Sequence, residues 1–316
     1  MQTYKIIYIF LFLFFSCDKL PRATGANNEI TIVTSNEDVD FVKLYVKQLF
    51  EKSIYTPIEE NLYDINIINA SSFNSNKYKK NIIIVSLENP MDKDVDLLSK
   101  KIIKQYDNSG ILSMYDLYAS NQIILNIYSH DSNKLGIDMN INKEWIYDEV
   151  VKNIEKNYLY DIDMRNKNKD IQSLLNEKFG LDMLIDENYK LIKNSDNFIW
   201  IGRGYPYRWI IFSQLDKKNL GDYDFKNRFI KFVDENIDGV NISEYMLKTE
   251  GDIIRGLYEH DKSGTGGPFF TYKYRNINKD KLIFVSGFVN NPGKKKAYLL
   301  LQLETIIKNI KGVYEQ

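Results

Sequence analysis

The sequence predicts an α+β protein made of two similar-sized halves of mainly antiparallel sheet with covering helices. Strand-like β-branched runs and amphipathic stretches at helical spacing occur in both halves. Each half offers strands, a helix, further strands and a closing helix. Because this order is not a strict alternation of strand and helix, a doubly wound parallel sheet is the less favoured arrangement.

The chain opens with a predicted lipoprotein signal peptide, residues 1–17. Lys5 precedes an unbroken apolar run at residues 6–15, which is shorter than the roughly 20 residues of a membrane-spanning helix. Residues 13–17 resemble a bacterial lipobox, in which a small residue precedes the cysteine. The resemblance implies that Cys17, the only cysteine, carries a diacylglyceryl thioether that anchors the chain. The alternative is an ordinary buried cysteine.

Residues 18–28 lack periodicity and are predicted to form a tether, followed by the N-terminal half at residues 29–160. Its expected strands are residues 29–35, 63–69, 81–87 and 121–129. A first helix is expected after Asn36 or Asp38, with Phe41, Leu44, Tyr45, Leu49 and Phe50 near helical spacing. A second helix is expected at residues 92–106, and a third begins at Asn142 with an apolar stripe from Trp145 to Tyr158.

The polar stretch at residues 161–169 is the predicted boundary, and the C-terminal half covers residues 170–316. Strands are expected at residues 182–192, 197–203, 207–214, 253–260, 268–275 and 282–289, and helices at residues 170–179 and 223–236. A terminal helix should bury Leu299, Leu303, Ile306, Ile307 and Ile310.

The composition disfavours several classes of function. Lys and Arg total 42 against 43 Asp and Glu, so no excess charge attracts nucleic acid. His130 and His260 are the only histidines, and with a single cysteine they leave almost no basis for a zinc site. We therefore expect no metal, no cofactor and no nucleic-acid partner.

Four stretches resemble an uncharacterised family of lipoproteins from Bacteroidetes-type bacteria, a domain of unknown function (DUF 4837). They are residues 21–33; residues 200–209 with Arg203 and Arg208; residues 255–269 with Gly266, Gly267 and Pro268; and residues 289–304 with Pro292, Lys296, Gln302 and Glu304. The resemblance covers nearly the whole mature chain. It implies a lipid-anchored envelope protein and brings no established activity.

The turn at residues 202–209 holds the densest set of potential ligand-binding side chains. Arg203 and Arg208 could hold a carboxylate or phosphate, and Tyr205 and Trp209 could stack on a sugar. The alternative is a plain hairpin whose aromatic residues fill the core while the arginines pair with nearby acids. Alternation along the strand favours this alternative.

Three other clusters are weaker candidates. His260 and Asp261 are residue types of a hydrolase without a recognisable nucleophile, and His130 stands at a strand end. The glycines at 264, 266 and 267 lack the order of a phosphate loop and predict a hairpin. Lys294, Lys295 and Lys296 lie where the terminal helix is expected to begin, an end at which the helix dipole disfavours cations. They could therefore bind an anionic partner such as phospholipid headgroups or an acidic polymer. The simpler alternative is that they reach into solvent.

The sequence thus favours a lipid-anchored protein in the outer or inner membrane of a bacterial envelope, facing away from the cytoplasm. Its expected partners are the membrane, through the lipid, and an envelope protein or polymer. A binding or assembly role is the leading hypothesis, and a hydrolase using His260 and a nearby acid is the alternative.

Overall fold

The computed structural model describes residues 19–315 apart from residues 57, 88–92, 106–109, 130–131, 217–224 and 277–280. Cys17, the predicted signal peptide and His130 lie outside the described residues. The α+β class is confirmed, with two separate main sheets. Within the described ranges, no helix combines the length and apolar character that crossing a bilayer requires.

The first sheet has the strand order β4-β1-β5-β7-β6. Its strands are β1 (Glu29–Val33), β4 (Asp64–Ile68), β5 (Asn81–Leu87), β6 (Ile111–Tyr115) and β7 (Ile123–Ser129). Only the β6–β7 pair is antiparallel, so the expectation of mainly antiparallel pairing is wrong for this half. Parallel neighbours need long crossover connections, and the helices after β1, β4 and β5 provide them. Six of the seven residues of β5 are buried, as expected for a parallel strand that is covered on both faces.

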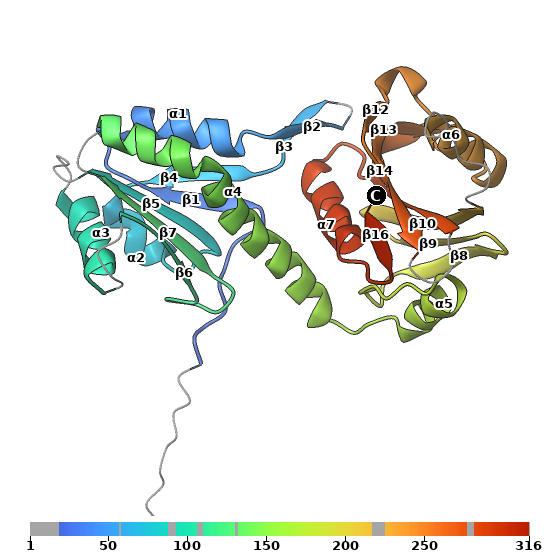
Figure 1. The fold of residues 1–316 in the computed structure, drawn as a ribbon, viewed down its shortest axis with the longest axis horizontal. Helices are drawn as coiled ribbons and strands as arrows, with labels where there is room; N and C mark the ends of the chain where they lie inside the picture. The colour runs from blue at the N-terminus through green and yellow to red at the C-terminus, as the bar shows by residue number, and fades with distance from the viewer. Residues whose placement is uncertain are drawn as a thin grey trace, which may run out of the picture.

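Helices cover both faces of the first sheet (Figure 1). On one side lie α1 (Val39–Phe50) and α4 (Ser132–Asp163), which pack on Ile30, Ile32 and Ile83, among others. On the other lie α2 (Phe73–Asn76) and α3 (Lys93–Gln105), beside the 3-10 turn Ala70–Ser72.

Helix α4 departs from the predicted helix in two respects. It begins at Ser132, ten residues earlier than expected, and Trp145 is 40% exposed instead of part of the buried stripe. Ile146, Val150 and Ile154 are buried at helical spacing. Trp145 stands about 100° around the helix from Ile146, which turns it away from that stripe. Leu44 of α1 was also expected to be buried, but it is 56% exposed. It lies on a different side of the helix from the buried Val42, Val46 and Leu49.

The second sheet is antiparallel throughout, with the main order β11-β13-β14-β15-β10-β9-β8. Two further strands pair outside this path, β12 with β13 and β16 with β14. The strands are β8 (Lys190–Ser195), β9 (Phe198–Arg203), β10 (Tyr207–Asp216), β11 (Val240–Ile242), β12 (Lys248–Glu250), β13 (Ile253–His260), β14 (Thr265–Asn276), β15 (Lys281–Asn290) and β16 (Val313–Glu315).

Three helices and two cores complete this half. Helices α5 (Lys169–Phe179) and α7 (Ala297–Lys308) enclose one core with the sheet, and α6 (Phe225–Asn236) encloses the other. A 3-10 turn, Glu244–Met246, precedes β12. Helix α7 buries the predicted Leu299, Leu303, Ile306 and Ile307, so its amphipathic pattern is confirmed.

A short hairpin of the first half reaches the second half. It consists of β2 (Ser53–Tyr55) and β3 (Glu59–Asn61), and Figure 1 shows it extending from the first sheet toward the strands of the second. Ile54 packs against the core between α5 and α7, and Leu301 of α7 packs against the core of the first half. The halves therefore interlock through apolar side chains as well as through the chain itself.

Candidate functional site

A cleft of about 620 Å³ lies between the two halves. Its walls come from the β2–β3 hairpin and α4 on one side and from β13, β14 and α7 on the other. The volume falls within the range of ordinary small-molecule sites, about 300–1,000 Å³. Apolar side chains make up much of the lining, among them Ile54, Leu62, Val151, Met246, Leu257, Pro268, Leu300 and Leu301.

Aromatic side chains of the first half form one wall of the cleft. The hydroxyls of Tyr63 and Tyr147 lie 3.1 Å apart, and the Lys52 ammonium stands 3.6 Å from the centroid of the Tyr147 ring. Burial raises the pKa of Tyr63, and its hydrogen bond to Tyr147 adds to the effect. Two hydrogen-bonded tyrosine hydroxyls and a cation on an aromatic face make this wall suitable for an apolar ligand with a polar end.

An ion pair between the half-buried Arg255 and the buried Glu304 forms the opposite wall. Arg255 Nη1 donates to Glu304 Oε2 at 3.1 Å, and Arg255 Nη2 donates to Glu304 Oε1. The Tyr272 hydroxyl also donates to Glu304, and Lys308 Nζ lies 3.2 Å from it. Burial alone would raise the pKa of Glu304, but the bonds and charges of Arg255, Lys308 and Tyr272 outweigh burial and lower it to about 2.

The carboxyl group of Glu155 faces this ion pair from α4. Burial raises its pKa, the charge of Lys308 lowers it and the charge of Glu304 raises it further. Both oxygens of Glu304 already accept hydrogen bonds, so its charge is neutralised within the protein. The Arg255–Glu304 pair therefore gives the wall shape and polarity and leaves no unpaired charge for a ligand. The arrangement suits recognition of a partner with an apolar surface.

A second pocket, of about 590 Å³, brings together several residues that the sequence singled out. His260, Asp261, Gly266, Gly267 and Lys296 all line it. His260 ends β13, and its Nδ1 lies 3.2 Å from the Ser263 hydroxyl within the tight turn. Asp261 accepts a hydrogen bond of 2.6 Å from Asn241. Both side chains are thus engaged with the turn and its neighbouring strand.

The glycine-rich segment is a hairpin between β13 and β14, as the sequence predicted. A Cβ on Gly267 would lie less than 3.0 Å from the carbonyl oxygen of Val289, and one on Gly266 equally close to that of Tyr258. The glycines are required because backbones approach closely, so these contacts explain them without a phosphate ligand.

The β9–β10 hairpin separates the predicted ligand-binding side chains onto two faces. Trp209 packs with Trp200, Tyr258 and Phe288 on the α6 side, with a Trp200–Trp209 centroid distance of 5.7 Å. Tyr205 is 54% exposed at the turn.

The two arginines lie on the opposite face of this hairpin. Arg203 is 3.6 Å from Asp186, whereas Arg208 is buried and donates to the amide oxygen of Gln302. The alternative of a plain hairpin, with aromatic residues in the core and arginines paired with acids, describes Trp209 and Arg203. It does not describe Tyr205, which is exposed, or Arg208, which bonds to a neutral amide.

The lysines before α7 lie next to acids of the first half. Lys295 Nζ is 3.2 Å from Asp64, and the side chain of Lys296 is turned back onto the Lys294 carbonyl at 3.1 Å. The backbone N–H groups of Lys296 and Ala297 donate to Glu60 Oε2 at 2.6 and 2.9 Å. The Glu60 carboxylate of β3 therefore binds the N-terminus of α7. The residues around Glu60 along the chain gave no indication of this contact.

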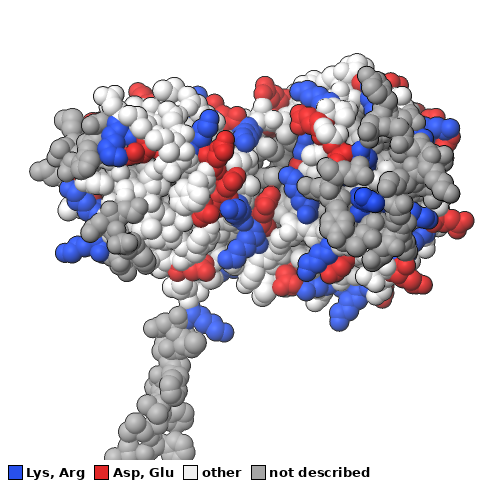
Figure 2. Space-filling view, viewed as in Figure 1, with Lys and Arg blue, Asp and Glu red and all other residues white. Residues whose placement is uncertain are grey.

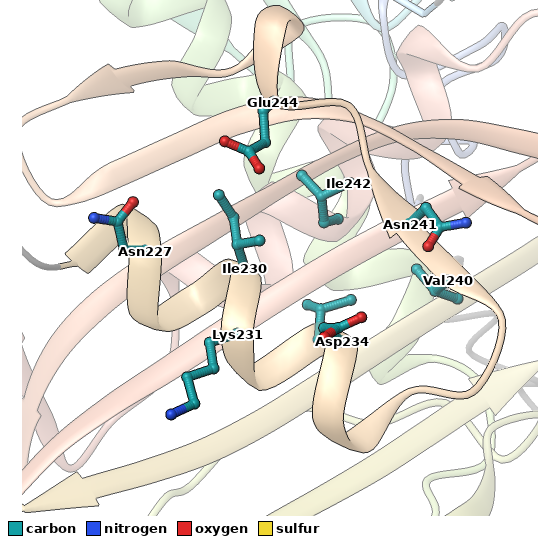
Figure 3. Close-up of a pocket in the computed structure, with 9 residues that line it drawn as sticks. Asn227, Ile230, Lys231, Asp234, Val240, Asn241, Ile242 and Glu244 are labelled. Atoms are coloured by element: carbon teal, nitrogen blue, oxygen red, sulfur yellow. The ribbon is translucent and has the colours of Figure 1, made fainter.

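A third, open pocket of about 440 Å³ lies between α6 and the segment that begins with β11. Figure 3 shows Ile230 and Asp234 on the helix and Ile242 and Glu244 across from them. Its mixed lining offers no charged cluster. Elsewhere in the described part of the chain, no group of three or more His, Cys, Asp or Glu side chains has the spacing of a metal site.

Charged side chains of both signs are scattered over the face shown in Figure 2, where Lys and Arg alternate with Asp and Glu across both halves. This distribution agrees with the near-zero net charge of the sequence. An extended basic surface of the kind that binds nucleic acid is not seen on this face.

The stretches that suggested the family resemblance in the second half meet in space. Arg255 pairs with Glu304, Arg208 bonds to Gln302, and Gly267 lies against Val289. They surround α7 and contribute to both the cleft and the second pocket.

Parts of the chain are similar in structure to three solved proteins. The Saccharomyces cerevisiae Ran-binding protein Mog1p is 10% identical, with 42% of this chain and 89% of that chain covered and a TM-score of 0.30. A mutant of the protein Mog1 gives 11% identity, coverage of 42% and 90%, and the same score. LpqN, involved in cell envelope biogenesis of Mycobacterium tuberculosis, is 15% identical, with coverage of 41% and 81% and a TM-score of 0.25. No curated protein matches the sequence.

Two family models divide the chain. Residues 23–158 match the domain of unknown function DUF8532, and residues 166–309 match the domain of unknown function DUF4837. The resemblance expected across the mature chain is thus assigned to DUF4837 in the second half and to a different family in the first. The resemblance to DUF4837 is thus confirmed for residues 166–309, where the family model matches.

Proposed function

We propose that this chain is a lipid-anchored protein of the bacterial cell envelope that binds a partner in the cleft between its two halves. The cleft itself carries the binding part of the proposal. It is the size of a ligand site, and it combines an apolar lining with an aromatic wall and a satisfied ion pair. The N-terminal pattern that ends at Cys17 carries the anchoring part.

The lining indicates which kind of partner fits. An apolar segment would bury its surface against Leu257, Val151 and Leu301, and a polar end would meet Lys52 beside Tyr147. An envelope protein segment or a polymer with apolar substituents has this chemistry. A strongly charged ligand would find the charges of Arg255 and Glu304 already paired.

Filling the cleft tests the binding proposal. Val151→Trp inserts a large side chain from α4 into the cleft, and Leu44→Trp makes a comparable change at an exposed position of α1. We expect partners that co-purify from detergent-solubilised native membranes to be lost with V151W and retained with L44W, while both variants keep the wild-type thermal unfolding midpoint within a few degrees. Identical co-purified partners for a folded V151W protein would contradict the proposal.

Fatty-acid labelling tests the anchor separately. Cells given an alkyne-tagged fatty acid should label the wild-type chain and not Cys17→Ala, because the Cys17 thiol is the proposed attachment point of the lipid. Equal labelling of both proteins would exclude lipidation at Cys17.

A hydrolase remains the second candidate because His260 and Asp261 share one pocket. In an enzyme, His260→Ala would abolish turnover of an envelope polymer and leave stability unchanged. In a binding protein the same variant would keep partner retention, because His260 lies outside the cleft.

A further inference from the structure

We infer that Arg203 and Arg208, side by side on the β9–β10 hairpin, form a binding site for a dianionic phosphoryl group. The site is separate from the cleft, because none of its residues lines that cleft. Four observations carry the inference: the register of the two arginines, the lack of a carboxylate at Arg208 among the described residues, the burial of Arg208, and the surplus of cations around it.

The sheet places the two guanidinium groups together. Arg203 and Arg208 are directly paired across β9 and β10, so both side chains project from the same face. Directly opposed residues in an antiparallel pair have Cβ atoms about 5 Å apart, and like charges in such a pair destabilise the sheet. An arrangement of this kind needs an anion between or beside the two cations.

The nearest carboxylate, Asp186, is already engaged. It is 2% exposed, and its Oδ2 lies 3.0 Å from Arg165 Nη1 and 3.6 Å from Arg203 Nη1. Its Oδ1 accepts from the backbone and side chain of Asn188. Two arginines, Arg165 and Arg203, therefore share this one acid.

Arg208 has no acid of its own. Among the described residues, no carboxylate lies within 4.0 Å of it, and its side-chain bond goes to the neutral amide of Gln302. It is 6% exposed, and its Nε has no hydrogen-bond partner in the described structure, as is also true of the Arg203 Nε. Removing a guanidinium group from water without a compensating anion is costly. Burial lowers the pKa of Arg208, and the charge of Arg203 acts in the same direction.

The excess of positive charge around Arg203 and Arg208 favours an anionic ligand. Arg165 and Arg203 share the single acid Asp186, and Arg208 lies directly across the strands from Arg203. The chain as a whole is nearly neutral, so this cluster is a local surplus. A phosphoryl group carries about 1.5 to 2 negative charges at pH 7, which two planar guanidinium forks can match through paired hydrogen bonds.

Thermal unfolding in phosphate and in chloride at equal ionic strength and pH tests the inference. Inorganic phosphate should raise the wild-type midpoint by about 2 °C or more, and acetate should raise it less because it is a monoanion. Arg208→Met keeps the apolar stem and removes the charge, so it should lose the phosphate shift while its midpoint in chloride stays at or above that of the wild type.

A second variant supplies the missing anion within the chain. Gln302→Glu places a carboxylate next to Arg208, so its midpoint in chloride should rise and its response to phosphate should fall. Gln48→Glu makes the same chemical change at an exposed position of α1 and should behave like the wild type. If phosphate shifts wild type, R208M and Q302E equally, or acetate matches phosphate, the inference is wrong. If R208M is destabilised in chloride and phosphate has no effect on the wild type, Arg208 serves only to join β10 to α7.

Discussion

Replacing Glu60 should uncouple the two halves of the protein. Glu60 belongs to β3 of the first half, yet its Oε2 accepts hydrogen bonds from the first backbone N–H groups of α7, and its Oε1 accepts one from the Thr56 hydroxyl. Glu60, Lys296 and Ala297 are all at least nine-tenths buried. Water therefore cannot readily replace the carboxylate.

The magnitude follows from these contacts. Leaving a buried donor unsatisfied costs about 1–3 kcal/mol, and Glu60→Ala leaves two, although local relaxation recovers part of the loss. The favourable interaction of a carboxylate with the helix N-terminus adds about 0.3–2 kcal/mol. We expect E60A to lower the free energy of unfolding by about 3 kcal/mol. Glu60→Gln, which keeps an acceptor and loses the charge, should lower it by about 1 kcal/mol.

Urea denaturation followed by tryptophan fluorescence measures the difference. Glu59→Ala is the matched control, because Glu59 is exposed on the same strand and its side chain bonds to the Ser53 hydroxyl. It should change the free energy of unfolding by no more than about 0.5 kcal/mol. Equal m values would show that all variants expose the same surface. If E60A and E59A unfold at the same urea concentration, Glu60 does not stabilise α7 and the reasoning fails.

Two further predictions concern the second half. Because the pKa of Glu304 is lowered from 4.5 to about 2, its ion pair stabilises the fold above the unfolded pKa, and this stabilisation, on the order of 3 kcal/mol, should be lost as the pH falls from about 5 to 2. Glu304→Gln should flatten the pH dependence of the unfolding free energy in that window, and an unchanged slope would show that other carboxylates cause it. Gly267→Ala should destabilise the protein by more than about 2 kcal/mol because its Cβ would collide with the Val289 carbonyl, whereas Gly204→Ala, with open space around it, should be tolerated in the same denaturation assay.

Patterns within single segments were enough to predict most elements of the second half. The hairpin at residues 197–214 and the buried face of α7 appeared as strand alternation and helical spacing, and both depend only on residues near one another in the chain. The same reasoning predicted a helix after the first strand but placed Leu44 inside it, because periodicity assigns a face only approximately when apolar residues surround the helix.

Strand partners in the first half could not be predicted in the same way. Whether β1 pairs parallel or antiparallel with β4 and β5 depends on how the connecting helices cross the sheet, and no local pattern specifies that path directly. The short β2–β3 hairpin was missed because three-residue strands carry too little periodic signal.

The sequence by itself determined the α+β class, the terminal helix and the glycine hairpin, because each of these depends on neighbouring residues. Only the tertiary structure decided which charges meet. It brought Glu60 to α7, paired Arg255 with Glu304, and left Arg208 beside a neutral amide. Electrostatic free energy depends on distance and burial in three dimensions, and neither can be obtained from the order of residues along the chain.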